Sequence, residues 1–213
     1  MPPVSTAVQR TRRREQRENT RREILAAADG ILRERPYRDL SIDLVMAQTG
    51  LTRTAFYRHF DDVPDLVLRL LAEVGHELFA VAERWRQRDV TEFALAGREA
   101  LRGTVDFWVR HGRLIRAVHD AATTDEIVEE GYQRFVDQFT EIIAEGLQSL
   151  ADRGWISVPD VGALALALNL MNEAFLLAEF GQEPLGDPDV AVATLETVWL
   201  RVIAPPTPPP PAA

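Results

Sequence analysis

The sequence predicts an all-α protein of about nine helices. Apolar residues recur at the 3.6-residue spacing of amphipathic helices, and no segment shows the alternation of a half-buried strand. Hydrophobic residues make up 46% of the 213 residues, which is enough to bury a core. The helices are expected at roughly 20–35, 42–49, 53–60, 63–87, 92–110, 112–122, 125–152, 159–181 and 188–203.

The charge is divided unevenly along the chain. The whole chain carries a net charge of -9, but residues 1–60 hold 12 of the 24 basic and 7 of the 33 acidic residues. The first part is therefore positive by 5 and the remainder negative by 14. Because phosphate attraction is screened beyond ~8–10 Å, the local surplus matters more than the total. This division favours a small nucleic-acid-binding module attached to a larger acidic domain.

Several classes of protein are disfavoured. Without cysteine there can be no disulfide, thiolate metal site or thiol nucleophile. No unbroken apolar run reaches the ~18–20 residues that span a bilayer. The basic N-terminal residues precede no apolar segment of the kind found in secretory signals. We therefore expect a cytoplasmic protein that acts away from the membrane and needs no cofactor or metal.

Capping residues divide the N-terminal region. Residues 1–19 lack apolar periodicity and are expected to form a flexible basic arm. Thr20 should open the first helix in a capping box with Glu23. Further helix starts are expected where capping residues precede apolar periodicity, and a turn where glycine can adopt a left-handed conformation. The caps are Ser41, Thr52 and Asp61-Asp62 before Pro64, and the turn is at Gly50.

Three short helices with a glycine turn before the third suggest a helix-turn-helix domain over 20–62. The start of the third helix should enter the major groove, where Arg53 can donate two hydrogen bonds to guanine, worth ~1–3 kcal/mol of discrimination. Tyr57 and His59 lie farther along and can reach phosphates. The alternative is a helical domain with an ordinary charged face. The candidate DNA-binding residues are Arg13, Arg14, Ser41, Thr52, Arg53, Thr54, Tyr57, Arg58 and His59.

The segment 50–60, GLTRTAFYRHF, resembles the signature of the TetR family of transcriptional regulators. That resemblance implies a homodimer on a palindromic operator, released when a ligand binds the C-terminal domain. The chain departs from the family pattern at Met46, usually alanine, at Ala55, usually threonine, and at Val63, usually lysine. The last two changes imply a weaker hold on the DNA backbone, for which arginines of the arm could compensate by entering a minor groove.

The remaining residues, 63–204, are expected to bind a ligand and form the dimer. The helix at 161–180 is apolar nearly all round and so must be covered on two sides. Asn169, Asn172 and Glu173 lie on one face of it, and a buried amide without a partner costs ~1–3 kcal/mol. The partner could be a ligand, a neighbouring helix or a water. The stretch 167–173, ALNLMNE, is similar to the EthR-like branch of the TetR family, which implies a pocket for elongated apolar molecules.

The expected ligand is a small apolar or amphipathic molecule, and aromatic side chains should wall its pocket. Plain core packing is the alternative for each of them. The last two helices should pair with their copies in a second subunit as a four-helix bundle. The proline-rich tail, 205–213, is expected to be disordered. The candidate ligand-binding residues are Phe107, Trp108, Tyr132, Val136, Phe139, Asn169, Asn172 and Phe175.

Two other functions compete with a ligand-released repressor. Glu73 and His76 have the Glu-x-x-His spacing of di-iron carboxylate bundles, which also need a second such pair and two more glutamates. None of the other histidines has a glutamate three residues before it, which disfavours an enzyme. The second alternative is a DNA-binding activator or architectural regulator without a ligand. A tightly packed C-terminal core would favour it.

Overall fold

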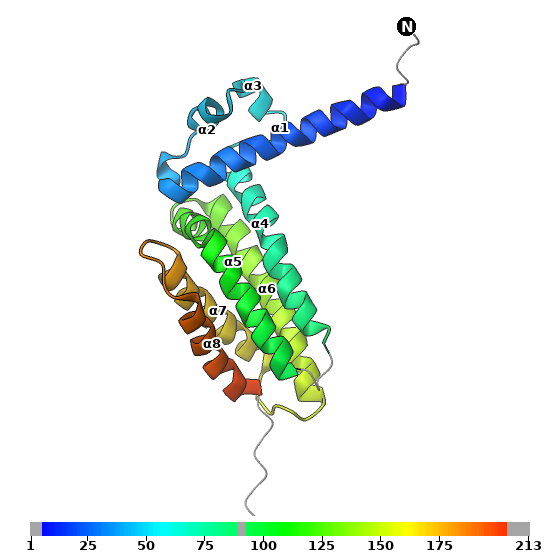
Figure 1. Ribbon diagram of the computed structural model, residues 1–213, viewed down its shortest axis with the longest axis vertical. Helices are drawn as coiled ribbons and strands as arrows, with labels where there is room; N and C mark the ends of the chain where they lie inside the picture. Colours follow the sequence, from blue (N-terminus) through cyan, green and yellow to red (C-terminus); the bar gives the residue numbers. More distant parts are fainter. Residues whose placement is uncertain (1–5, 89–92, 204–213) are drawn as a thin grey trace, which may run out of the picture.

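The computed structural model describes residues 6–88 and 93–203 and confirms the all-α fold class (Figure 1). This part of the chain contains eight α-helices, one fewer than expected, and a short 3-10 turn called η1. Part of the predicted arm and the whole proline-rich tail lie outside the described residues. The elements are α1 Thr6–Glu34, η1 Tyr37–Asp39, α2 Ile42–Thr49, α3 Arg53–Phe56, α4 Val63–Arg86, α5 Phe93–Ala122, α6 Glu126–Asp152, α7 Val161–Phe180 and α8 Pro188–Ile203.

The first helix begins at Thr6, so the expected start at Thr20 was wrong. Residues 8–19 are exposed, which is why they show no apolar periodicity. They are nevertheless rich in arginine, glutamate and glutamine, which favour helix, and they extend a helix already nucleated by the packed residues that follow. The described part of the basic arm is therefore a helical extension that projects beyond the body (Figure 1).

The predicted helices 92–110 and 112–122 are one continuous helix, α5, which explains the difference in helix number. Gly112 is an interior residue of this helix. A Cβ at Gly112 would lie 2.4 Å from the carbonyl oxygen of Phe180 at the end of α7. The glycine therefore allows two helices to approach closely and does not break one.

The helix-turn-helix head is formed by the C-terminal half of α1 with α2 and α3. Ser41 caps α2 as expected, since its hydroxyl accepts the amide of Leu44 at 3.2 Å, and Gly50 ends α2 with φ 68°. Thr52 occupies the N-cap position of α3, but its side chain makes no capping hydrogen bond, contrary to expectation. The α-helical part of α3 is also shorter than the predicted 53–60, and turns continue it to Phe60.

The body is a bundle in which α4, α5 and α6 pack together and α7 and α8 cover one side (Figure 1). Asp62 caps α4 by accepting the amide of Asp65 at 2.8 Å. The helix α4 starts directly after the head and runs down the body. The head is also held to the body by Tyr37 of η1, whose hydroxyl donates to Asp125 at 2.9 Å. Burial and this carboxylate raise the pKa of Tyr37 above its usual value.

The helix α7 is long and apolar enough to cross a membrane by length and composition alone, whereas we expected no such segment. One face of this helix is buried against the body, through Ala165, Leu168 and Leu176 among others. The opposite face carries small and apolar side chains that are exposed in the single chain. The sequence predicted that this helix must be covered on two sides. The body covers the first face, and the second face is exposed in the single chain.

Candidate DNA-binding face and ligand cavity

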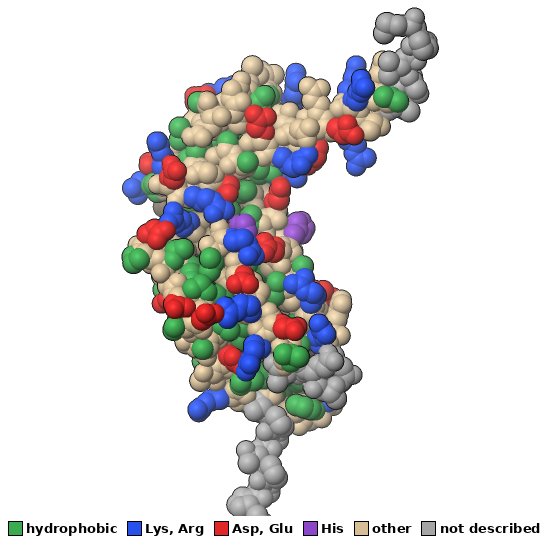
Figure 2. All heavy atoms as spheres, viewed as in Figure 1, with side chains coloured by type: hydrophobic (Ala, Val, Ile, Leu, Met, Phe, Trp, Pro, Cys, Tyr) green, Lys and Arg blue, Asp and Glu red, His purple; other side chains and the backbone are tan. Residues whose placement is uncertain are grey.

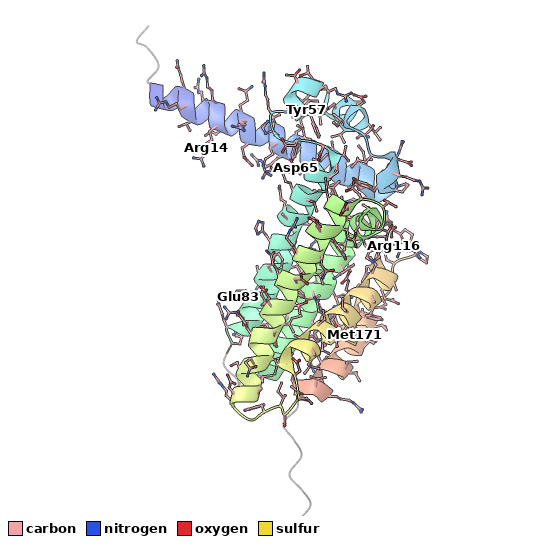
Figure 3. The ribbon with its side chains drawn as sticks, turned by 180° about the vertical axis from the view of Figure 1, so that it is seen from behind. Arg14, Tyr57, Asp65, Glu83, Arg116 and Met171 are labelled. Carbon is pink, nitrogen blue, oxygen red and sulfur yellow. The ribbon has the colours of Figure 1, made fainter. Side chains whose placement is uncertain are left out.

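The predicted DNA-contacting residues gather on the head at α3, α2 and the neighbouring length of α1. Phe56 and Phe60 are buried beneath α3, with ring centroids 5.5 Å apart, and anchor it to the head. Tyr57, the residue that directly follows α3, remains 52% exposed (Figure 3). Exposed positions are also occupied by Arg13, Arg14, Ser41, Thr52, Arg53, Thr54 and Arg58, whereas His59 is half-buried.

Arg53 is already engaged in the free protein. Its Nη1 atom lies 2.7 Å from Oδ1 of Asp43 on α2. A hydrogen bond with Tyr57 and the charge of Asp43 raise the pKa of Arg53 above its usual value. Arg53 must therefore leave or share these partners to donate to a base. Asp43 was not predicted to be part of this face. Its place on the adjoining helix, ten residues before Arg53, was the sequence feature that could have indicated the pair.

A groove of about 1100 Å³, counted to its open mouth, separates the extension of α1 from α3. Arg17 crosses it and donates to the backbone carbonyl of Arg58 at 3.3 Å. Burial, together with the nearby charge of Arg17, lowers the pKa of His59. The groove is lined by Arg13, Gln16, Arg17, Thr20, Leu51, Ala55, Arg58 and His59.

Met46 and Ala55, where the chain departs from the TetR-family pattern in α2 and α3, have different consequences. Met46 is buried, with 5% of its surface exposed, and fits into the core between α2 and α3. Ala55 lies on the groove without a hydroxyl that could donate to phosphate. The groove instead brings Arg13 and Arg17 beside α3, so cationic groups are placed near the position where that donor is missing.

The body contains a hollow, called the inner cavity, that measures about 430 Å³ counted to its open mouth and leaves about 30 Å³ of free space inside. It is lined by Leu78, Thr104, Phe107, Trp108, Ile115, Tyr132, Phe135, Val136, Phe139, Asn169, Asn172 and Glu173. Seven of the eight candidate ligand-binding residues are on this wall. Phe175 is not among them and is half-buried against the core. Most of the candidate aromatic side chains are therefore buried in the core and also border the inner cavity.

The asparagines of α7 have protein partners. Asn169 is 5% exposed, and its amide donates to Thr140 Oγ1 at 2.8 Å and to the carbonyl of Val136 at 3.3 Å. Asn172 is 6% exposed, and its Oδ1 atom accepts the indole N–H of Trp199 at 3.1 Å. The sequence left a ligand, a neighbouring helix or a water as possible partners, and the neighbouring helices α6 and α8 supply these hydrogen bonds. Asn172 nonetheless faces cavity space on two sides.

A second cavity of about 550 Å³, counted to its mouth, adjoins the first and is called the outer cavity. Thr104, Phe139 and Asn172 line both cavities. The outer cavity is lined by Ala82, Trp85, Gly97, Arg98, Ala100, Leu101, Thr104, Phe139, Ile143, Asn172, Glu196, Trp199, Leu200 and Ile203. Trp199 was a weaker candidate for the pocket wall, whereas Trp85 was not predicted to take part, because it meets Trp199 only in the tertiary structure.

Trp85 and Trp199 meet edge to face at 6.1 Å in the outer cavity. At the inner cavity, the Tyr132 hydroxyl donates to Glu173 of α7. Burial and the charge of Glu173 raise the pKa of Tyr132 above its usual value. The combined space is therefore mostly apolar with a few polar groups, which is the composition of small-molecule pockets.

The metal-site alternative finds no support in the geometry. Glu73 forms an ion pair with Arg21 at 3.3 Å, and His76 is exposed. Within residues 6–88 and 93–203, no three histidine, aspartate or glutamate side chains are close enough together to hold a metal ion.

Together, the head and the hollow body define a helical, helix-turn-helix transcriptional regulator with a C-terminal cavity. Residues 24–79 match the family described as bacterial regulatory proteins of the tetR family. Residues 97–204 match the family described as transcriptional regulator EthR, C-terminal domain. The chain belongs to the TetR family of DNA-binding transcriptional regulators and carries an EthR-type C-terminal domain.

Two relatives agree with this assignment, and a solved structure shares the fold. The chain is 29% identical over 184 residues to the HTH-type transcriptional regulator EthR of Mycobacterium tuberculosis H37Rv, covering 84% of this chain and 85% of the relative. EthR of Mycolicibacterium smegmatis is 27% identical over 188 residues, with 84% of each chain covered. The fold is similar to that of NalD, the secondary repressor of the MexAB-OprM multidrug efflux pump in Pseudomonas aeruginosa, with a TM-score of 0.69 and 21% identity, covering 89% of this chain and 98% of NalD.

Proposed function

We propose that this regulator is a ligand-released repressor that acts in the cytoplasm as a homodimer on a palindromic operator. The observation that carries the proposal is the course of α4. This helix starts at the DNA-binding head, and its side chains Leu78, Ala82 and Trp85 form part of the cavity walls. One rigid element therefore connects the place where a ligand would bind to the place where DNA would bind.

Contacts with DNA would be made by the exposed face of the head. The N-terminal residues of α3 would read bases in the major groove, with Arg53 moving from Asp43 to a guanine. Tyr57 and Ser41 would donate to phosphates. The extension of α1 would bring Arg13, which lines the groove beside α3, and Arg14 to the flanking backbone or minor groove.

The dimer would form through α7 and α8. Leu166 and Leu170 of α7 are 41% and 47% exposed in the single chain. Between and beside them, Ala163, Ala167 and Ala174 present small side chains that let a second helix approach closely. Val190 and Val198 continue an exposed apolar surface on α8. Two copies would bury these faces in a four-helix bundle and hold two heads about one DNA turn, ~34 Å, or a multiple of it apart.

Release would follow from a change in the separation of the heads. A ligand between α4 and α7 would push on Leu78 and Ala82 and tilt α4 with the head attached to it. The coupling in such systems is typically ~1–3 kcal/mol, which corresponds to a roughly 5- to 150-fold loss of operator affinity. The space now free inside the outer and inner cavities is about 50 Å³ and about 30 Å³, so a ligand would enter by moving apart side chains such as Phe139 that line both. The alternative without a ligand, for which we expected a tightly packed core, is distinguished by the ligand arm of the test below.

The test is to select operators from genomic fragments with the purified protein and to measure their binding with and without cavity ligands. We expect a salt-sensitive preference for a two-fold symmetric site, a dimeric mass, and loss of affinity on adding ligand. A protein with no preferred genomic sequence would contradict the proposal. A promoter-reporter assay with and without the gene distinguishes repression from activation.

A further inference from the structure

An ion pair between α5 and α8 lies where the outer cavity meets the surface, and we call this place its mouth. Arg98 of α5 donates through Nε to Oε1 of Glu196 on α8 at 2.8 Å. Both residues line the outer cavity, and both also line an open surface groove just outside it. Charged side chains of both signs are spread over the surface of the body (Figure 2), so this pair is distinguished by its place at the mouth and not by its charge alone. A molecule entering from this side must pass or replace that pair.

The two partners are not equally accessible to water. The Arg98 side chain is 64% exposed, whereas the Glu196 side chain is only 18% exposed. If Arg98 swings away, its guanidinium is readily hydrated. Glu196 would instead be left half-enclosed by the cavity wall without its cation, which is costly for a carboxylate. The pair therefore opens cheaply only if a new cation replaces Arg98.

The rest of the lining agrees with this asymmetry. Apart from Arg98 and Glu196, the remaining charged side chain on the walls of the two cavities is another carboxylate, Glu173, bonded to Tyr132. No second basic side chain lines either cavity within the described residues. Beyond the mouth, the walls around Trp85 and Trp199 are apolar and lead to the inner cavity at Phe139.

We propose that the effector is a cationic amphiphile, whose ammonium group replaces Arg98 at Glu196 and whose apolar chain occupies the outer cavity and, past the shared side chain of Phe139, the adjoining inner one. The inference rests on the proposed ligand-released function and names the chemistry of the ligand. A carboxylate head is disfavoured because it would bind Arg98 and leave Glu196 without a cation. A neutral head would gain nothing from breaking the pair.

The experiment compares three probes with the same chain, dodecylamine, dodecanol and dodecanoic acid, below their aggregation concentrations. Binding to the purified full-length protein is measured by calorimetry and by tryptophan fluorescence, and release from the selected operator by gel shift. Dodecylamine should bind about tenfold or more tightly than dodecanol, as expected for one charge-assisted hydrogen bond. Dodecanoic acid should bind more weakly than dodecanol.

Glu196→Gln removes the charge with little change of shape and should abolish the preference for the amine while leaving dodecanol binding within about twofold. Arg98→Gln removes the competing cation and should tighten amine binding. Glu99→Gln is the matched control, because Glu99 lies in the outside groove but does not line the outer cavity. It should leave the preference unchanged.

Equal binding of all three probes, preference for the acid, or an amine preference that survives in Glu196→Gln would overturn the headgroup inference and leave the cavity as a neutral site. If no probe binds and none affects the operator complex, the proposed ligand-released function itself has failed.

Discussion

The head and the body use their buried and exposed residues in opposite ways. In the head, a few buried aromatic side chains such as Phe56 and Phe60 support a surface whose exposed polar residues are the proposed DNA contacts. In the body, the exposed surface is acidic and the candidate functional space lies inside, among buried side chains of α4 to α8. Substitutions in the head should therefore change DNA binding with little cost in stability. Substitutions in the body should change both stability and ligand response.

The largest effect is expected for Tyr57→Ala. Tyr57 is exposed and is proposed to contact phosphate, so its removal should lower operator affinity by at least about 30-fold per complex, the cost of an interface hot spot. The dimer mass and the thermal midpoint should stay close to those of the unchanged protein. Leu95→Ala, an exposed body position, is the control for gel shifts. Retained operator binding in Tyr57→Ala would mean that α3 is not the recognition element.

A pair of substitutions in α7 separates ligand contact from packing. Asn172→Leu leaves the buried indole N–H of Trp199 without its acceptor and should lower the free energy of unfolding by about 1–3 kcal/mol. It should also change ligand affinity while preserving operator affinity, because Asn172 lines both cavities. Denaturant unfolding and calorimetry measure the two effects.

Asn169→Leu is the counterpart, because the Asn169 amide donates to Val136 and Thr140, both on α6. A similar loss of stability is expected, with a smaller change in binding of ligands that occupy the outer cavity. Equal ligand effects from both substitutions would show that Asn172 acts only through packing.

The extension of α1 should contribute through phosphate charge. Replacing Arg13 and Arg14 by glutamine should weaken binding to every DNA sequence alike and lower the slope of log affinity against log salt by about 1 for each lost contact. The measurement is operator affinity over a series of salt concentrations. Arg153→Gln, at the C-cap of α6, is the control for loss of one positive charge outside the head, to be compared with each single replacement of Arg13 or Arg14. An unchanged slope would place the extension away from DNA.

Asp43→Asn should strengthen DNA binding modestly. The substitution releases Arg53 from a surface ion pair and removes a negative charge from the DNA-binding face. Because exposed pairs are worth ~0.2–1 kcal/mol, the expected gain is about 1.4- to fivefold per subunit. Fluorescence anisotropy with operator DNA measures it. Weaker binding in Asp43→Asn would mean that Asp43 positions Arg53 for base contact.

The smallest effect concerns pH. Burial, followed by the charge of Arg33, lowers the pKa of His111, and burial lowers that of His59. A histidine with a lowered folded-state pKa favours folding when neutral, so its contribution is present above the unfolded pKa of about 6.5 and is lost as pH falls below it. Stability should therefore decline with acidification from about pH 6.5. His111→Gln should flatten this decline, and an unchanged profile would exclude His111 as its cause.

Local sequence patterns determined most of the helices and the DNA-binding face. Caps at Ser41 and Asp62 and the glycine turn at Gly50 act within a few residues, so their hydrogen bonds can be predicted without the fold. The positions exposed on α3 could be predicted from the same short-range sequence patterns. The helical extension from Thr6 was missed because apolar periodicity reports packing, whereas an exposed helix can persist on propensity alone.

Only the tertiary structure decided what the buried residues of the body do. Gly112 lies inside the continuous helix α5. Its missing Cβ leaves room for the end of α7 at Phe180, which is far along the chain. Asn169 and Asn172 acquired partners on α6 and α8, and Trp85 met Trp199 across the outer cavity. Burial, hydrogen-bond satisfaction and empty space depend on the approach of distant segments. Sequence spacing could indicate which residues face inward, but not what they would meet there.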